Sequence, residues 1–381
     1  MNITPRKIHY VSGSRADFGL MARSLQHLAA QPSFDIGVVV TGQHLIAQYG
    51  DTRADIIDAG LTVVADIPVT LTGHDGAEMG HALAEELAGF LRLWHRTPPD
   101  LVLVLGDRGE MLAAALAAVH LGLPVAHLHG GEVSGTLDES LRHAISKLSH
   151  YHFTATQEAA TRLTRMGEDP AHVWVVGAPG LVGLTEGIDH DPAWLGRTFG
   201  VPAARHHILV MFHPVVQEAT AAGAQMQIIV DLLAARDCAG ILMRPNSDAG
   251  GAAIDAVLDR AATALPGFVI CDHMSRPAYL RTLAHVDMLI GNSSSGIIES
   301  ASFDLPCLNI GTRQDARQRN KNVVDCPQID PATLASAFYK ATKLTGPFEN
   351  LYGDGQAHVY LSALLQRLVL DPAHLSKRMT Y

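Results

Sequence analysis

Short apolar runs that end in polar, glycine-containing loops are the feature that most constrains this fold. Two clear examples are the stretches at residues 102–110 and 125–140, where each apolar run leads through such a loop into an Ala/Leu-rich segment. A continuous apolar run of this length is typical of a strand buried on both faces, as in parallel sheets. The same alternation extends over residues 7–176 and restarts over 207–310. The sequence therefore predicts an α/β fold with doubly wound parallel sheets.

The loops after these two runs carry five titratable residues: Asp107, Arg108, His129, Glu132 and Asp138. In an open α/β sheet, ligands bind at the carboxyl ends of the strands. Asp residues at such positions also often cap helices, which explains one of them more easily than the whole set. The whole set therefore predicts a catalytic site at the carboxyl ends of these strands.

The length of 381 residues exceeds what one hydrophobic core usually serves, so two domains are expected. Gly, Pro and acidic residues interrupt the alternation between Gly177 and about Pro202, where we expect the linker. We expect a first Rossmann-like domain at 1–180, which holds the catalytic acidic residues, and a second, nucleotide-binding Rossmann-like domain at 200–360. Residues 361–381 are expected to form a C-terminal helix that packs back on the first domain.

Composition narrows the class of protein. A content of 48% hydrophobic and 17% charged residues is typical of a globular chain, and the net charge of −10 argues against nonspecific nucleic-acid binding. The four scattered cysteines predict free thiols in a reducing compartment. No signal peptide and no apolar run of membrane-spanning length is recognised, so a cytoplasmic location and no membrane partner are expected.

Two loops are candidate anion sites. The first, SGSRADFG at residues 12–19, includes Arg15 and Asp17 and is neither a Walker A loop nor GxGxxG. The second, GNSSSG at 291–296, offers Ser293, Ser294, Ser295 and Gly296 at a predicted helix start, with Glu299 placed to bind a ribose. A simple serine N-cap explains one of these serines but not three. The basic loop at 311–321 follows and suits phosphate neutralisation.

Six motifs are distributed along the chain: SGSRADFG (12–19), LGDR (105–108), GGEVSGTLD (130–138), LRHAISK (141–147), GNSSSG (291–296) and NIGTR (309–313). Together they resemble the motifs of the hydrolysing UDP-N-acetylglucosamine 2-epimerases of sialic acid and legionaminic acid biosynthesis. The resemblance covers nearly the whole chain. The non-hydrolysing 2-epimerases share the GNS region but differ at the first loop and at the Gly-Gly-Glu segment.

The resemblance implies two Rossmann-like domains facing across a cleft, as in GT-B glycosyltransferases, a homodimer or homotetramer, and neither metal nor nicotinamide. It implies a hydrolase acting on a nucleotide sugar: UDP leaves C1 as the C2 proton is removed, and water then adds to the resulting glycal. The substrate would be UDP-GlcNAc or UDP-2,4-diacetamido-2,4,6-trideoxyglucose, and the product ManNAc or its 2,4-diacetamido analogue. The base, uracil or guanine, stays open.

The family's residue roles transfer by motif position. Proton-transfer roles fall on Asp107 and Asp138, with His129, Glu132 and His213 completing the expected catalytic set. The positions expected near the diphosphate and nucleoside are Arg15, Asp17, Arg108, Arg244, Asn246, His273, Ser293, Ser294, Ser295, Gly296, Glu299 and Arg313. His129 stands where well-known members carry Glu, and an imidazole can still shuttle a proton near neutral pH.

Three alternatives remain at this stage. His127 and His129 lie two apart on a predicted strand and so face one side, which would suit a metal-dependent hydrolase with Asp107 and Glu132. A GT-B glycosyltransferase would use the same nucleotide site but need an acceptor. A sugar-nucleotide sensor would bind without turnover.

Overall fold

The structure is a computed structural model that describes residues 4–46, 52–70, 76–133, 137–245, 250–378 and 380. The chain divides into two units. Unit 1 comprises Met1–Gly183 and Tyr352–Tyr381, and unit 2 comprises Leu184–Leu351. Unit 2 thus ends at Leu351, ahead of the boundary at residue 360 expected from the sequence, and the chain then returns to unit 1.

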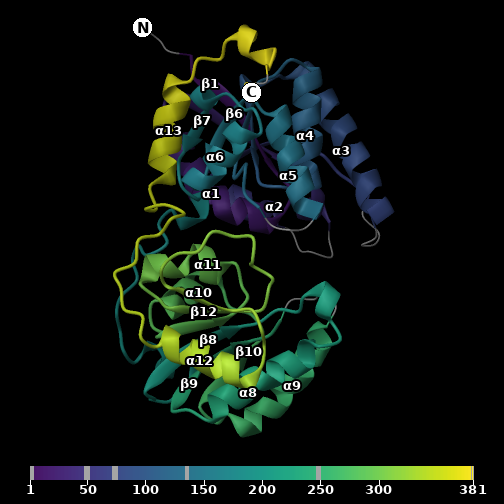
Figure 1. The fold of residues 1–381 in the computed structure, drawn as a ribbon. Coiled ribbons are helices and arrows are strands. Elements are labelled where there is room, and N and C mark those ends of the chain that lie inside the picture. Colours follow the sequence, from purple (N-terminus) through teal and green to yellow (C-terminus); the bar gives the residue numbers. More distant parts are fainter. Residues whose placement is uncertain are drawn as a thin grey trace. The chain divides into compact units, whose positions relative to one another are not determined.

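Unit 1 contains a seven-stranded sheet with the order β3-β2-β1-β4-β5-β6-β7, of which Figure 1 labels β1, β6 and β7. All neighbouring strands pair in parallel. The strands are β1 (Arg6–Ser12), β2 (Phe34–Val40), β3 (Thr62–Asp66), β4 (Leu101–Leu105), β5 (Val125–Leu128), β6 (Tyr151–Thr154) and β7 (Val173–Val175). The helices are α1 (Arg15–Ala29), α2 (Arg53–Asp58), α3 (Gly76–Arg96), α4 (Gly109–His120), α5 (Leu137–Leu148), α6 (Gln157–Arg165) and α13 (Ala357–Arg367).

Unit 2 contains a six-stranded parallel sheet with the order β10-β9-β8-β11-β12-β13. The strands are β8 (His206–Met211), β9 (Cys238–Met243), β10 (Phe268–Cys271), β11 (Met288–Gly291), β12 (Cys307–Ile310) and β13 (Val323–Cys326). The helices are α7 (Trp194–Phe199), α8 (Ala222–Ala234), α9 (Gly251–Ala264), α10 (Arg276–Leu283), α11 (Ser295–Ile298) and α12 (Pro331–Ala341). Its strand order is that of a Rossmann sheet, and the first six strands of unit 1 repeat it, so the predicted fold class is confirmed.

Each sheet is buried on both faces, which explains the continuous apolar runs. In unit 1, one core joins the sheet to α1 and α13 through Phe18 and Leu361, and the other joins it to α3 and α4 through Trp94 and Met111. In unit 2, α8, α9 and α12 cover one face, and α7 and α10 cover the other. The described helices include none that is both long and apolar enough to cross a lipid bilayer.

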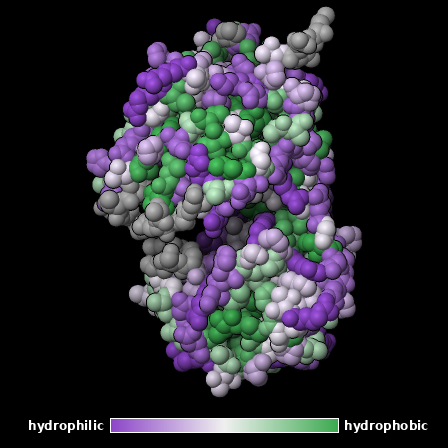
Figure 2. Space-filling model, turned by 180° about the vertical axis from the view of Figure 1, so that it is seen from behind, coloured by the Kyte–Doolittle hydropathy of each residue, from purple (hydrophilic) through white to green (hydrophobic). Residues whose placement is uncertain are grey.

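Large apolar side chains that remain exposed occur on several elements of the described chain. Ile57, Met79, Tyr339 and Val369 come from separate parts of the chain. Figure 2 shows hydrophobic residues interspersed with hydrophilic ones on the face that it displays. Single exposed apolar residues are normal on the surface of a globular protein.

Three elements differ from the sequence-based expectation. The first helix begins at Arg15, inside the predicted anion loop at 12–19, because Ser14 and Asp17 form a capping box. The strand β13 was not predicted, since it is a four-residue edge strand interrupted by Asp325. Helix α7 lies inside the predicted linker, because Trp194 and Leu195 are buried in the core of unit 2.

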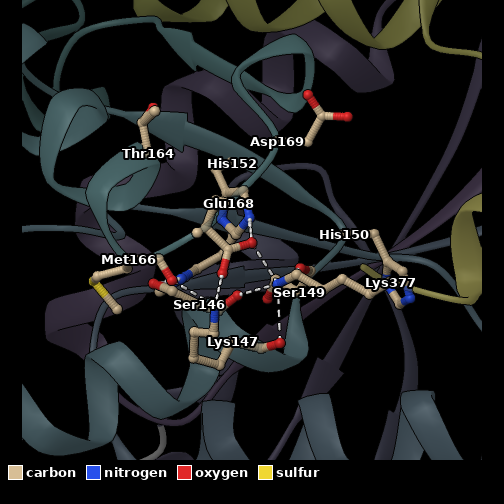
Figure 3. Close-up of polar contacts among 12 residues, drawn as sticks. Ser146, Lys147, Ser149, His150, His152, Thr164, Met166, Glu168, Asp169 and Lys377 are labelled. Carbon is tan, nitrogen blue, oxygen red and sulfur yellow. Dashed lines mark hydrogen bonds and ion pairs between the residues drawn. The ribbon is translucent and has the colours of Figure 1, made fainter. Parts of the chain in front are cut away.

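The C-terminal segment is attached to unit 1 by a buried ion cluster, shown in Figure 3. The Lys377 ammonium lies 2.5 Å from Glu168, whose side chain is 1% exposed. It also donates to the carbonyls of Ser146, Lys147 and Ser149 at the end of α5. Lys147 and His152 donate to the same carboxylate, at 2.7 and 2.9 Å. Burial raises the pKa of Glu168, but these hydrogen bonds outweigh it and hold the pKa at about 2.

We expect Lys377→Met to lower the free energy of unfolding by about 1–3 kcal/mol, because the carbonyls at the end of α5 lose their donor. Urea unfolding measures this loss. The matched control is Arg378→Met, which removes the neighbouring exposed cation. Equal stability of the two variants would show that the ion cluster does not anchor the C-terminal segment.

Candidate active site

The loop after β4 places Asp107 at the carboxyl edge of the unit 1 sheet, beside the end of β5. Its carboxylate is ion-paired with Arg142 of α5, whose side chain is only 5% exposed. Gly106 supplies the turn with a φ of 80°, a conformation that favours glycine. A buried arginine paired with a carboxylate fixes the direction of that carboxylate, so Asp107 is held as an oriented acceptor.

His127 in β5 supports this turn from below. Its Nε2 lies 2.7 Å from the Gly106 carbonyl oxygen and its Nδ1 lies 3.0 Å from Ser146 Oγ. Burial lowers the pKa of His127 to about 3, so the imidazole is neutral. With both nitrogens used, His127 has none free for a metal, and no three His, Cys, Asp or Glu side chains converge as metal ligands within the described residues.

His129 follows β5 in a left-handed conformation with a φ of 59°. Only a few per cent of non-glycine residues adopt positive φ, and they concentrate at functional sites. Its Nδ1 is hydrogen-bonded to Glu132, and both side chains are mostly buried. Its Nε2 is buried and has no hydrogen-bond partner in the described part of the chain. The ring is thus oriented by Glu132, and its second nitrogen is not engaged by the described residues.

The remaining unit 1 positions lie nearer solvent. Asp138 is the second residue of α5 and is exposed, and Arg108 is exposed at the start of α4. Arg15, the first residue of α1, is exposed and forms an ion pair with Asp55 at 3.0 Å. The structure therefore joins Asp107 to Arg142 and His129 to Glu132, and leaves Asp138 and both arginines at the surface.

Asp17 is buried beneath the loop after β1. It accepts hydrogen bonds from the backbone N–H groups of Gly13 and Ser14, at 3.0 and 2.8 Å, and from the hydroxyls of Ser12 and Ser14. The N–H groups of Gly13 and Ser14 that the sequence offered to an anion are thus engaged by Asp17. Burial and the charge of Glu110 raise the pKa of Asp17 to about 6, although these hydrogen bonds lower it.

Two further carboxyl groups pack near this loop and were not recognised from the sequence. A Cβ on Gly13 would lie 2.6 Å from Oε1 of Glu110, so a larger residue there would displace the Glu110 side chain. Glu86 of α3 accepts from the Thr41 hydroxyl at 3.1 Å. Burial first, then the charges of Glu110 and Glu85, raise the pKa of Glu86 to about 8, although the Thr41 bond lowers it.

This raised pKa makes stability depend on pH. Between the ordinary value of 4.5 and about 8, Glu86 is protonated in the folded chain and ionised in the unfolded one, so stability falls as pH rises through this window. We expect Glu86→Gln to stabilise by about 1–3 kcal/mol at pH 8.5 and by little at pH 5. Thermal unfolding at both pH values measures this. Glu349→Gln, which removes an exposed glutamate of unit 2, is the control, and an equal gain in both variants would refute this prediction.

In unit 2, Asn292 organises the carboxyl edge between β8 and β11. Its side chain accepts from the His213 N–H at 2.8 Å and donates to the His213 carbonyl at 2.7 Å. Its own carbonyl accepts from Arg313 and Gln314, both at 3.0 Å. Asn292 and Gln314 were not singled out from the sequence. These contacts bring His213 and Arg313 to the loop at residues 291–296, called the serine loop below.

The serine loop itself is only partly engaged. The Ser295 hydroxyl donates to Glu299 at 2.7 Å and contacts Tyr279. Ser294 precedes α11 without a side-chain cap bond, and Ser293 Oγ accepts from the Ser295 N–H at 3.4 Å. Gly296 packs so closely on β12 that a Cβ would lie 2.6 Å from the Cys307 sulfur. The hydroxyl of Ser294 therefore does not act as a helix cap.

Glu299 forms a bidentate ion pair with Arg276 of α10, at 3.1 and 2.8 Å. Arg276 was missed because nothing in the sequence relates α10 to the serine loop. Arg244 pairs with three carboxylates, Asp255, Asp259 and Asp272, which offset its charge. His273 is exposed after β10. Asn246 lies outside the described residues.

The profile of the UDP-N-acetylglucosamine 2-epimerase family matches residues 26–366 of this chain. The UDP-N,N'-diacetylbacillosamine 2-epimerase (hydrolyzing) of Legionella pneumophila is 42% identical, over 99% of this chain and 100% of that protein. The UDP-N-acetylglucosamine 2-epimerase of Neisseria meningitidis serogroup B is 31% identical, over 90% of this chain and 89% of that one.

A solved structure gives the same fold. The crystal structure of UDP-GlcNAc 2-epimerase from Neisseria meningitidis bound to UDP-GlcNAc superposes with a TM-score of 0.72 at 17% identity, covering 95% of this chain and 100% of that one.

Proposed function

Because the chain belongs to the UDP-N-acetylglucosamine 2-epimerase family, and is thus a UDP-sugar 2-epimerase, we propose that it is a hydrolysing one, which releases a free sugar and UDP. The proposed substrate is UDP-N,N'-diacetylbacillosamine, the UDP-linked 2,4-diacetamido-2,4,6-trideoxyglucose. The relative named for that substrate is 42% identical, against 31% for the UDP-GlcNAc enzyme.

The observation that carries this proposal is the pair of oriented groups on neighbouring strands of unit 1. Asp107 is fixed by Arg142 after β4, and His129 is fixed by Glu132 after β5. Removal of a proton from carbon and its return to the opposite face need two separately positioned groups. A fixed carboxylate and an imidazole with a free nitrogen meet that need.

The reaction then runs in two balanced steps. In the first, Asp107 takes the C2 proton as the C1–O bond breaks, which leaves a C1–C2 double bond and UDP. In the second, the oxygen of water bonds to C1 while C2 gains a proton on the other face, with His129 as the proposed donor. We propose that Asp138, which is exposed at the start of α5, takes the proton that this water loses.

Unit 2 supplies the proposed nucleotide site. Arg313, His213 and the serine loop share the carboxyl edge organised by Asn292. Cations and hydroxyl donors there would stabilise the charge of the departing diphosphate. Glu299, held by Arg276, presents a carboxylate for the ribose hydroxyls.

We expect Ser294→Ala to weaken UDP binding by about 1–2 kcal/mol, because its hydroxyl is not used as a helix cap and is proposed to donate to the diphosphate. Isothermal titration calorimetry with UDP measures this. Ser302→Ala removes a hydroxyl that accepts from Asn350 instead, and serves as the control. Unchanged UDP affinity in Ser294→Ala would place the diphosphate elsewhere.

Isotope labelling tests the proposed reaction. In heavy water, UDP-N,N'-diacetylbacillosamine should yield a free sugar with the manno configuration and deuterium at C2. In oxygen-18 water the label should appear at C1 and not on UDP. Hydrogen retained at C2 would refute the epimerase reaction, label on phosphate would indicate attack at phosphorus, and a strict need for an acceptor would indicate a glycosyltransferase. UDP-GlcNAc in parallel tests the choice of sugar.

A further inference from the structure

A pocket lies in unit 2 at the amino ends of β8 and β9. Its volume is about 290 Å³, and residues before both strands and at the end of α12 line it. Because the strands of this sheet are parallel, the pocket lies at the opposite edge from Asn292 and the serine loop. Figure 1 shows α12 with β8 and β9 in this unit. The pocket is therefore separate from the proposed nucleotide site.

The residues that line the pocket carry more positive than negative charge, although the chain as a whole is acidic. Three cationic side chains, Arg205, Arg236 and Lys343, line it against a single carboxylate, Asp237. Within the part of the chain that the structure describes, none of the three forms an ion pair. Elsewhere in unit 2, arginines such as Arg276 are paired with carboxylates. In a chain of net charge −10, this local excess of positive charge favours an anion.

Two aromatic rings hold cations in place. The Arg236 guanidinium lies 4.8 Å from the centre of the Phe338 ring, and Lys343 Nζ lies 5.0 Å from the centre of the Tyr339 ring. A cation held against an aromatic ring has already lost part of its conformational freedom, so binding a ligand costs less entropy. Phe338 is buried, whereas Tyr339 is 64% exposed and offers an apolar surface beside the cations.

The dipoles of the neighbouring helices alone do not explain why three cations gather in this pocket. Lys343 follows the C-terminal end of α12, where cations commonly offset the helix dipole. Arg236 follows the C-terminal end of α8 and donates to the Leu232 carbonyl of its last turn. Arg205 comes from the segment before β8, so the helix dipole does not account for this third cation. A pocket near 300 Å³ is at the lower end of small-molecule sites.

We propose that this pocket binds a small organic phosphate or carboxylate, with the anionic group on Arg236, Arg205 and Lys343 and an apolar or planar part on Tyr339. Guanidinium and ammonium groups together suit phosphate oxygens. The inference does not depend on the proposed reaction, since it concerns binding at the other edge of the sheet.

Calorimetry tests the proposal, with phenyl phosphate as the probe and saturating UDP present. Inorganic phosphate and benzoate in separate titrations distinguish the anionic from the planar contribution. We expect phenyl phosphate to bind at millimolar or lower concentration and more tightly than inorganic phosphate. Arg236→Gln and Lys343→Gln should each weaken it by at least about 5-fold. Arg260→Gln, which removes an exposed arginine of α9, should leave it unchanged.

Several results would overturn the proposal. These are no binding to the wild-type chain at millimolar concentration, equal binding by the wild type and both pocket variants, or the same loss in Arg260→Gln. Loss of phenyl phosphate binding when UDP is added would place the probe in the nucleotide site instead. Two separate pocket variants are used so that one failing to fold does not prevent the test, and circular dichroism checks folding. No turnover is measured, so failure of the proposed reaction would not affect the outcome.

Discussion

The Asp107→Asn variant is expected to lose about 10²- to 10⁴-fold of its turnover, because the amide keeps the shape of the side chain but cannot accept the C2 proton. UDP affinity should stay nearly unchanged, since the diphosphate contacts are proposed in unit 2. Turnover of UDP-N,N'-diacetylbacillosamine and calorimetry with UDP measure the two effects separately.

The matched control is Asp58→Asn, an exposed carboxylate at the end of α2. Its turnover should equal that of the wild type. The Arg142 guanidinium loses a charged partner in Asp107→Asn, so the unfolding free energy is measured in parallel. Wild-type turnover in a folded Asp107→Asn variant would contradict the assignment of Asp107 as the base.

His129→Asn is expected to reduce sugar release by about 10²-fold and to let the glycal accumulate. Asparagine tolerates the left-handed conformation of this position, so the backbone at φ 59° should persist while the imidazole is lost. Detection of the glycal by mass spectrometry during turnover measures the effect directly.

His120→Asn, at the exposed end of α4, controls for the loss of a histidine. It should change neither rate nor product. If His129→Asn slowed turnover without glycal, His129 would act before the intermediate forms, and unaltered kinetics would remove it from the mechanism.

The apolar runs and the glycine-containing loops between them were sufficient to predict both parallel sheets and most of their strands. A strand buried on both faces must be continuously apolar, so its pattern is visible in the sequence alone. Where an element is short or its partner is distant, this signal is lost. β13 contains Asp325 and is at the sheet edge, and α7 is defined by Trp194 and Leu195 packing in the core of unit 2.

The same reasoning predicted which residues follow the strands but not how they pair. Asp107, His129 and Glu132 were recognised by position. Their partner Arg142 was quoted only as part of a motif, because the pairing of α5 with the β4 loop is a long-range contact. The unpartnered Nε2 of His129 likewise depends on the surrounding packing.

The sequence by itself determined the fold class and the residues at the carboxyl ends of the strands, because both follow from local patterns of apolar and polar residues. Only the tertiary structure decided which of these side chains have partners in the chain. It engaged Asp17 with the loop above it, surrounded Arg244 with carboxylates, and joined Arg142 to Asp107. Charges and hydrogen bonds between distant segments depend on packing, which no local pattern encodes.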